Sequence, residues 1–183
     1  MNILILSASP NIDGLTAACA RAAVEGVQAA GHQAEELRLT DLDIRRCRAC
    51  GNGWGTCREE QRCCQEDDFT KVQERFRTAD AYILVTPVYF GEPSEAMKAF
   101  ADRLRRCNHA RGAKPSELSG KPIMAVAAAG GSGNGYLNCL ACLERWSEHL
   151  SLRKFDFIGV TRFTRAYKLA QITQAAKAMI SGV

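Results

Sequence analysis

The sequence predicts a doubly wound α/β domain, in which a five-stranded parallel sheet carries helices on both faces. Short apolar runs of strand length alternate with longer stretches whose apolar residues recur every three or four positions. The length of 183 residues, 46% of them hydrophobic, is enough for one domain with a full core. Strands that alternate with helices are joined by right-handed crossovers, which place helices on both faces of the sheet. We therefore expect residues 1–183 to form a single domain.

This alternation can be followed along the whole chain. Helical periodicity follows the first strand, and Gly31 is expected to end that first helix. Asp67 or Asp68, and later Ser94, are suited to cap helices, because their side chains can accept hydrogen bonds from free backbone N–H groups. The predicted strands are 2–7, 33–39, 81–86, 122–128 and 155–160, and the predicted helices are 15–30, 69–76, 94–104, 139–150 and 169–180.

Composition and charge argue against several classes of function. The 24 basic and 20 acidic residues give a net charge of +4 and are spread along the chain, whereas a nucleic-acid-binding surface needs a concentrated basic stripe. The sequence has neither the basic leader and cleavage site of a signal peptide nor an apolar run long enough to span a membrane. We therefore expect a cytoplasmic protein that binds neither nucleic acid nor membranes.

The loop after the first predicted strand, residues 7–16, has the composition of a phosphate-binding loop. It leads into a helix N-terminus, where free N–H groups and the helix dipole favour an anion, and it adds the hydroxyl groups of Ser7, Ser9 and Thr16. The loop lacks both the lysine motif of nucleoside triphosphate sites and the glycine pattern of dinucleotide folds, which favours a phosphate monoester. The alternative is an ordinary turn capped by Asp13 or Thr16.

Two further loops follow the third and fourth predicted strands. Residues 86–94 include Tyr89, Phe90 and Gly91, so that a planar ring could lie against the backbone and stack on an aromatic side chain; alternatively, both aromatics pack under the next helix. Residues 129–135 are rich in glycine, which allows either close approach of a ligand or a flexible linker. Ligands bind at the carboxyl edge of such sheets, where all three loops would lie. Together the loops predict FMN.

These residues resemble the flavodoxin-like NAD(P)H-dependent FMN reductases, in the branch related to iron-sulfur flavoproteins. The resemblance covers nearly the whole chain and rests on Ser9-Pro10-Asn11 with Gly14-Leu15-Thr16, on Thr86-Pro87-Val88-Tyr89-Phe90-Gly91, and on Met97-Lys98-Ala99-Phe100-Ala101-Asp102-Arg103. It implies a flavodoxin-like fold, bound FMN, reduction by NADH or NADPH, and a homodimer or homotetramer. Many relatives carry Arg and Asn where this chain has Asn11 and Leu15, so backbone and hydroxyl donors are expected to matter more. The residues expected to bind FMN are Ser9, Asn11, Gly14, Leu15, Thr16, Pro87, Val88, Tyr89, Phe90, Gly91, Gly130 and Gly131.

Five of the nine cysteines fall between residues 47 and 64, within a stretch (40–66) that we expect to be a loop insertion beside the flavin. The candidate metal ligands are Cys47, Cys50, Cys57 and Cys63, for a [4Fe-4S] cluster or for zinc. Their spacing departs from the compact motif of iron-sulfur flavoproteins and contains only one pair typical of zinc sites, so neither metal is the favoured interpretation. A redox-active thiol pair, and thiols without a redox role, remain open. Cys19, Cys139 and Cys142 are expected in the core.

The function that we predict is that of an FMN-dependent oxidoreductase. It would take hydride from NADH or NADPH and pass electrons to a quinone, a free flavin or a similar acceptor, with Tyr89 in contact with the ring or substrate and no catalytic acid or base assigned. Two other functions remain open: a flavodoxin-like electron carrier, with or without a [4Fe-4S] cluster, and a signalling or structural domain that binds no flavin. A solvated helix end, or alternatively a site for the NADPH phosphates, is expected at Arg103, Arg105, Arg106, Arg111 and Lys114.

Overall fold

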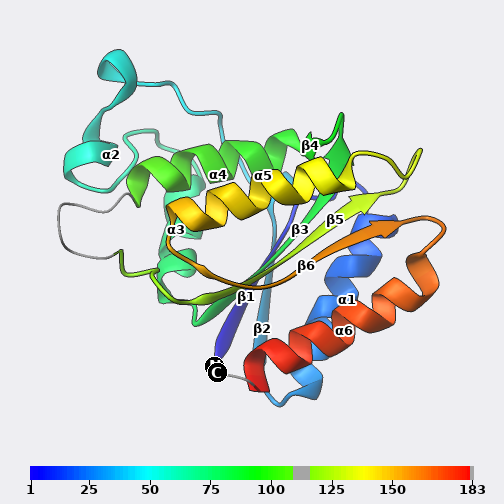
Figure 1. The fold of residues 1–183 in the computed structure, drawn as a ribbon. Helices are drawn as coiled ribbons and strands as arrows, with labels where there is room; N and C mark the ends of the chain where they lie inside the picture. Colours follow the sequence, from blue (N-terminus) through cyan, green and yellow to red (C-terminus); the bar gives the residue numbers. More distant parts are fainter. Residues whose placement is uncertain (109–115, 182–183) are drawn as a thin grey trace.

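A computed structural model of the protein describes residues 1–108 and 116–181 and has the expected doubly wound α/β architecture (Figure 1). The main sheet has the strand order β2-β1-β3-β5-β6, and all four of its pairings are parallel. The order reverses between β1 and β3, as in flavodoxin-like folds. The strands are β1 (Asn2–Ser7), β2 (Gln33–Arg38), β3 (Ala81–Tyr89), β5 (Pro122–Ala129) and β6 (Arg153–Thr161).

Helices cover both faces of this sheet. On one face lie α1 (Leu15–Ala29) and α6 (Arg165–Ser181), and on the other lie α3 (Phe69–Thr78), α4 (Glu95–Cys107) and α5 (Tyr136–His149) (Figure 1). Every predicted strand and helix is present, with ends that differ by a few residues. Residues 39–59 contain only the short turns η1 (Leu39–Asp41), η2 (Gly51–Gly53) and α2 (Thr56–Glu59). In the described ranges, no helix is both long and apolar enough to cross a membrane.

One short strand was not predicted. β4 (Glu92–Pro93) pairs antiparallel with the end of β3, so that β3 continues past its predicted end at Thr86 and turns back in a hairpin. Ser94 then caps α4, because its hydroxyl accepts a hydrogen bond from the N–H of Met97 at 3.5 Å. Gly31 follows α1 with a φ of +78°, which confirms the predicted helix end.

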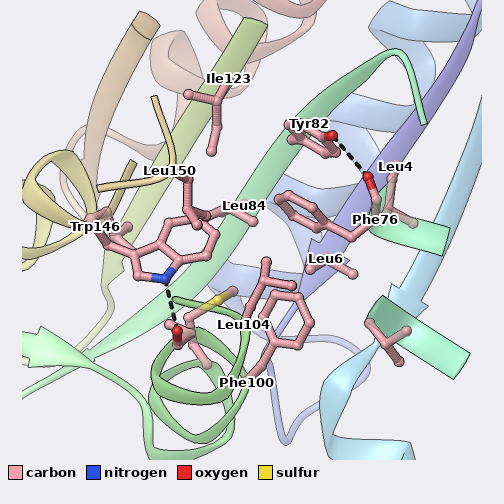
Figure 2. Packing of buried hydrophobic residues seen from close by; sticks show 14 of the residues in the cluster. Leu4, Leu6, Phe76, Tyr82, Leu84, Phe100, Leu104, Ile123, Trp146 and Leu150 are labelled. Atoms are coloured by element: carbon pink, nitrogen blue, oxygen red, sulfur yellow. Dashed lines mark hydrogen bonds between the residues drawn. The ribbon is translucent and has the colours of Figure 1, made fainter. Parts of the chain in front are cut away.

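A separate hydrophobic core fills each side of the sheet. On the side of α3, α4 and α5, the rings of Phe76 and Tyr82 stack with their centroids 3.8 Å apart, and Trp146 meets Phe76 edge-on (Figure 2). Both polar aromatic groups are satisfied, since Tyr82 donates to the Phe76 carbonyl at 2.8 Å and Trp146 Nε1 donates to the Ala101 carbonyl at 2.9 Å. These buried aromatic contacts fix α3 and α5 against β3.

The cysteines on the helices belong largely to these cores. Cys19 and Cys139 are buried, as predicted, and Cys142 is partly buried. Cys107, at the end of α4, is also buried. Burial raises the pKa of the Cys19, Cys107 and Cys139 thiols to about 12, because the thiolate would lose its hydration. These three thiols are therefore neutral at pH 7 and act as small apolar side chains.

The opposite face depends on a close approach between α1 and α6. Gly26 makes that approach possible, because a Cβ at this position would lie 2.4 Å from the carbonyl oxygen of Thr173 and 2.8 Å from Cβ of Ala176. Thr173 in turn donates its hydroxyl to the Ala22 carbonyl at 3.0 Å. The two helices thus meet backbone to backbone.

We predict that Gly26→Ala lowers the free energy of unfolding by about 1–3 kcal/mol, because the added methyl group forces α1 and α6 apart. Alanine ordinarily stabilises a helix relative to glycine, so a loss can come only from this contact. Urea denaturation of both proteins measures the difference. Gln28→Ala, on the exposed face of the same helix, is the control and should change stability by less than about 0.5 kcal/mol. A stabilised Gly26→Ala protein would contradict the packing described.

Candidate functional site

The N-terminus of α1 is open to an anion. Gly14 is the N-cap and offers no side chain to the first turn, which also contains no acidic residue. The cap expected for an ordinary turn, from Asp13 or Thr16, is therefore absent at this described helix end. Because the first N–H groups of a helix have no partner within it, and because the helix dipole is positive there, this end of α1 favours a phosphate group.

The loop that leads to α1 is held in shape from outside. The carbonyl of Ser9 accepts hydrogen bonds from Thr40 Oγ1 at 2.9 Å and from Arg38 at 3.4 Å, and the buried Ser9 hydroxyl donates to the Asn11 carbonyl at 2.6 Å. Thr16 is buried and Asn11 is exposed. The Ser7 hydroxyl instead donates to Glu36 at 2.9 Å, so it is engaged with β2 rather than with the loop.

The hairpin between β3 and β4 presents two aromatic side chains at the carboxyl edge of the sheet. Phe90 and Gly91 occupy its turn with φ values of +51° and +82°, a pattern typical of a type I′ hairpin turn. Phe90 is fully exposed and Tyr89 is 40% exposed, so the alternative that both pack beneath the next helix is wrong. Pro87 is buried and Val88 half-buried at the base of the hairpin. A bulky residue at positive φ is strained, which is frequent at binding sites.

The glycine-rich third loop touches both of the others. Gly135 has a φ of +81°, and a Cβ there would lie 2.8 Å from Cα of Gly91 and 3.4 Å from Val88. At the other end of the loop, a Cβ on Gly130 would lie 3.9 Å from Leu15, at the start of α1. Gly131 faces open space, with nothing within 4 Å of an added Cβ. The three predicted loops therefore meet at one edge, and their open helix end, exposed aromatics and uncovered backbone fit FMN.

A second site lies at the other end of α4. Six cysteines (Cys47, Cys50, Cys57, Cys63, Cys64 and Cys107) line one small pocket together with Arg103 and Arg106. The hairpin loop enters α4 at Ser94, and the helix rise places Arg103 about 14 Å further along the axis. The stretch 40–66 begins beside the three loops, where Thr40 contacts Ser9, but its cysteines lie away from them, contrary to the expectation. In Figure 1, α2 and β4 lie at opposite ends of α4.

The four candidate metal ligands share this pocket without forming a metal site. Among the residues that the structure describes, no three metal-ligating side chains converge on one point. The thiols in contact are those of Cys50 and Cys64, whose Sγ atoms are 3.7 Å apart, and Cys64 was not among the four candidates. A hydrogen bond to Cys64 raises the pKa of the Cys50 thiol. As placed, the donor set fits neither zinc nor a four-iron cluster.

Arg103 is not solvated, contrary to the expectation for this helix end. Its side chain is 1% exposed and makes two hydrogen bonds, of 2.5 and 2.9 Å, to the fully buried Asp67. Arg103 also donates to the Arg45 carbonyl at 3.0 Å, while Asp67 accepts from the backbone N–H groups of Arg45 and Phe69 at 3.1 and 3.2 Å. The pair therefore ties both ends of the cysteine segment, residues 45–67, to α4.

Burial opposes the ionisation of Asp67, but the hydrogen bonds from Arg103 and from these N–H groups outweigh it and hold the pKa below its ordinary value. Asp67 is therefore charged at neutral pH. It was predicted only as a helix cap, and Asp68 occupies that N-cap position in the structure.

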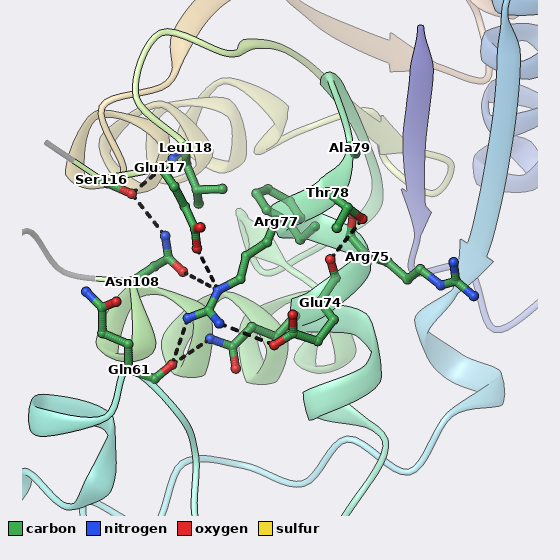
Figure 3. A network of polar contacts seen from close by, with 12 residues as sticks. Gln61, Glu74, Arg75, Arg77, Thr78, Ala79, Asn108, Ser116, Glu117 and Leu118 are labelled. Carbon is green, nitrogen blue, oxygen red and sulfur yellow. Dashed lines mark hydrogen bonds and ion pairs between the residues drawn. The ribbon is translucent and has the colours of Figure 1, made fainter.

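Two more arginines hold carbonyl groups inside the cysteine segment. Arg106 donates to the Gly53 carbonyl, and Arg77 donates at 2.9 Å to the Gln61 carbonyl, which also accepts from Gln73 at 2.9 Å. Figure 3 shows Arg77 joined to Gln61, Glu74, Asn108 and Glu117. Arg105 and Arg106 are half-buried, and Arg111 and Lys114 lie outside the described residues. Side-chain donors thus satisfy carbonyl groups of this irregular segment that helix or sheet hydrogen bonds would otherwise satisfy.

The comparisons with known proteins agree with this architecture. The family model described as NADPH-dependent FMN reductase matches residues 1–152, and the chain belongs to this family. An iron-sulfur flavoprotein of Archaeoglobus fulgidus is 35% identical over 105 residues, which cover 57% of this chain and 49% of that protein. An iron-sulfur flavoprotein of Methanosarcina thermophila is 32% identical over 138 residues, which cover 74% and 66%. The matches thus span about half to two thirds of these relatives.

Solved structures show the same fold at low sequence identity. The NAD(P)H:quinone oxidoreductase from Methanothermobacter marburgensis has a TM-score of 0.73 at 17% identity, covering 98% of this chain and 96% of that one. An NADH:FMN oxidoreductase in its apo form has a TM-score of 0.71 at 20% identity, covering 100% and 89%. The protein thus belongs to the NADPH-dependent FMN reductase family and has a flavodoxin-like fold.

Sequence reasoning missed several residues that shape both sites. Gly135 was seen only as part of a glycine-rich loop, and Thr40 followed a strand without any motif. Arg103 was grouped with four other basic residues nearby in the sequence, so its burial was not predicted. The signal for its burial was its position: Arg103 lies three positions after Phe100, on the apolar face of α4.

We predict that Gly135→Ala weakens FMN binding at least tenfold and also lowers the melting temperature, because the new Cβ would push the hairpin away from the third loop. Gly131→Ala is the matched variant, since its Cβ enters open space. It should weaken FMN binding while leaving the melting temperature of the flavin-free protein unchanged. Calorimetric titration with FMN and thermal unfolding separate the two effects. Equal FMN affinity in all three proteins would show that these loops do not hold the flavin.

We also predict that Asp67→Asn costs about 3–5 kcal/mol of unfolding free energy at pH 7, because Arg103 is left buried with an uncompensated charge. The folded-state pKa of Asp67 is lowered, so its contribution is present above the ordinary carboxyl pKa and is lost as pH falls through the lowered value. The difference between the two proteins should therefore shrink below about pH 4.

The control for this variant is Asp102→Asn, which breaks a half-exposed pair with Lys98 on the same helix. Exposed pairs contribute little, so the expected loss is below about 1 kcal/mol. Denaturant unfolding at several pH values measures both variants. Similar losses for Asp67→Asn and Asp102→Asn would contradict the role given to the buried pair.

Proposed function

We propose that this protein binds FMN at its three loops, takes hydride from NADH or NADPH, and passes the electrons to a quinone, a free flavin or a similar acceptor. The convergence of the three loops at the carboxyl edge carries the proposal. Membership in a family described as NADPH-dependent FMN reductase supports it. An NAD(P)H:quinone oxidoreductase and an NADH:FMN oxidoreductase among the structures of the same fold agree with it.

The residues of the chain bind and orient, and none of them has to transfer a proton. The N–H groups at the start of α1 would hold the phosphate, with Ser9, Asn11, Gly14, Leu15 and Thr16 around it. Pro87–Gly91 would lie against the ring on one side and Gly130 and Gly131 would approach it on the other. Tyr89 and Phe90, exposed at the hairpin, would stack on the nicotinamide or the acceptor. When bound, FMN supplies the hydride and electron chemistry.

The decisive experiment adds each nicotinamide to the full chain loaded with FMN, without oxygen. Bleaching of the flavin absorbance by NADH or NADPH, followed by recovery when a quinone is added, is expected. Protein that retains FMN but is bleached by neither nicotinamide would overturn the reductase proposal.

A second candidate function is suggested by the names of the relatives, although the described thiols do not form a cluster site as placed. Several relatives bear the name iron-sulfur flavoprotein, and six cysteines share one pocket in this chain. A flavodoxin-like electron carrier that exchanges electrons only with protein partners would bind FMN without oxidising a nicotinamide. The same anaerobic mixing separates the two functions, and iron and sulfide assays test whether a [4Fe-4S] cluster accompanies the flavin.

The proposal includes a cytoplasmic location and assembly as a homodimer or homotetramer, as the family resemblance implies. A basic net charge of +4 also distinguishes this chain from electron carriers, which are typically acidic. Light scattering of the FMN-loaded protein measures the number of subunits.

We predict that Asn11→Asp weakens FMN binding by about tenfold, which corresponds to about 1.4 kcal/mol, and leaves riboflavin binding unchanged. The new carboxylate would repel the phosphate, which riboflavin lacks. A negative charge near a helix N-terminus stabilises the flavin-free protein, so unfolding cannot explain a loss of FMN affinity. Fluorescence titration with both flavins gives the ratio. A parallel loss for both flavins would place the phosphate elsewhere.

A further inference from the structure

The thiols of Cys50 and Cys64 are in direct contact with each other inside the cysteine pocket. Their Sγ atoms are 3.7 Å apart, which is a hydrogen-bonding contact between two sulfurs, whereas a disulfide bond is about 2.05 Å long. The two residues are 14 positions apart in the chain, so this contact is made by the fold rather than by sequence neighbours. No third metal-ligating group within the described residues joins them.

The fold holds these two thiols together from both sides. Near Cys50, Arg106 anchors the Gly53 carbonyl, and Gly55 packs so closely that an added Cβ would lie 3.0 Å from Cβ of Cys50. Before Cys64, the Thr56 hydroxyl donates to the Arg62 carbonyl at 2.8 Å, which joins the two arms of the segment. These contacts hold the two stretches that carry Cys50 and Cys64 next to each other, so that a bond has only to close the gap between sulfurs 3.7 Å apart.

Exposure distinguishes Cys64 from its neighbour Cys63. Cys64 is exposed, so a reagent in solution can reach it. Cys63 is half-buried, packs against the hydrophobic core, and lies 4.0 Å from the Gln65 amide that donates toward its sulfur. Cys57 also packs against the core, and Cys107 is buried. The adjacent cysteines thus face different environments, and Cys64 is the one paired with Cys50.

We propose that Cys50 and Cys64 form a reversible dithiol–disulfide pair that exchanges with low-molecular-weight disulfides. The Cys64 thiolate attacks one sulfur of the external disulfide, forms a mixed disulfide and releases one small thiolate. The Cys50 thiolate then attacks the Cys64 sulfur, which completes the Cys50–Cys64 bond and releases the second small thiolate. Two protein thiols are oxidised, one external disulfide is reduced to two thiols, and the two protons pass to these thiols. This site is independent of the flavin proposed above.

The test treats the reduced full chain, without oxygen, with mixtures of oxidised and reduced glutathione, followed by alkylation of free thiols. Thiols are counted after denaturation, and disulfides are mapped by mass spectrometry of peptides. We expect the count to fall by two from nine and a single crosslink between Cys50 and Cys64. Excess reduced glutathione should restore all nine thiols.

The matched variants are Cys64→Ser and Cys63→Ser. Cys64→Ser should form no internal disulfide, and Cys63→Ser should form the same crosslink as the unchanged chain. A crosslink from Cys50 to Cys63 or to Cys47 would overturn the proposal, as would nine free thiols in fully oxidised glutathione. Bound iron or zinc that protects both thiols until a chelator removes it would also overturn it, by assigning the pair to a metal. If Cys63→Ser does not fold, the crosslink map of the unchanged chain decides alone.

Discussion

The buried ion pair between Arg103 and Asp67 is the interaction on which the arrangement of the molecule depends. Burying two charges is costly, and the cost is offset here because both Asp67 carboxylate oxygens and both terminal nitrogens of Arg103 are hydrogen-bonded, to each other and to the backbone around Arg45 and Phe69. Of the charged groups of this pair, only the Arg103 Nε is buried without a hydrogen-bond partner among the described residues. The pair joins the start and the end of the cysteine segment to the same helix. An irregular segment with few backbone hydrogen bonds of its own thereby gains a defined position.

The same helix separates two kinds of site. At its N-terminal end, the three loops bring together glycines, a free helix terminus and exposed aromatics, which form the proposed flavin site without the clustered cysteines. At its C-terminal end, Arg103 and Arg106 meet the thiols. In the proposed binding mode the cysteines do not hold the flavin, so the flavin proposal and the thiol proposal can fail independently.

Local signals in the sequence predicted much of this fold. β5 is wholly apolar and β3 is largely so because both faces of these strands are covered, and Ser94 and Gly31 mark helix ends through their own chemistry. β4 escaped prediction because a strand of two residues has no periodicity. The positions of the three loops followed from topology, since the carboxyl ends of parallel strands share one edge.

Long-range contacts could not be predicted in the same way. Asp67 looks like a helix cap in its local sequence, while its partner Arg103 is 36 residues away. Gly91 and Gly135 meet only after β3 and β5 are paired. Cys63 and Cys64 are adjacent and chemically identical, so only the fold determines which of them contacts Cys50. In each case the tertiary structure determines which residue makes the contact.

Hydrogen–deuterium exchange with and without FMN distinguishes flavin binding at the three loops from binding in the cysteine pocket. If FMN binds at the loops, backbone amides in residues 9–16, 86–91 and 130–135 exchange more slowly when FMN is present, with no change in residues 47–64. Protection confined to the cysteine segment, or no protection in any of the three loops under saturating FMN, would show that the flavin does not bind at the loops.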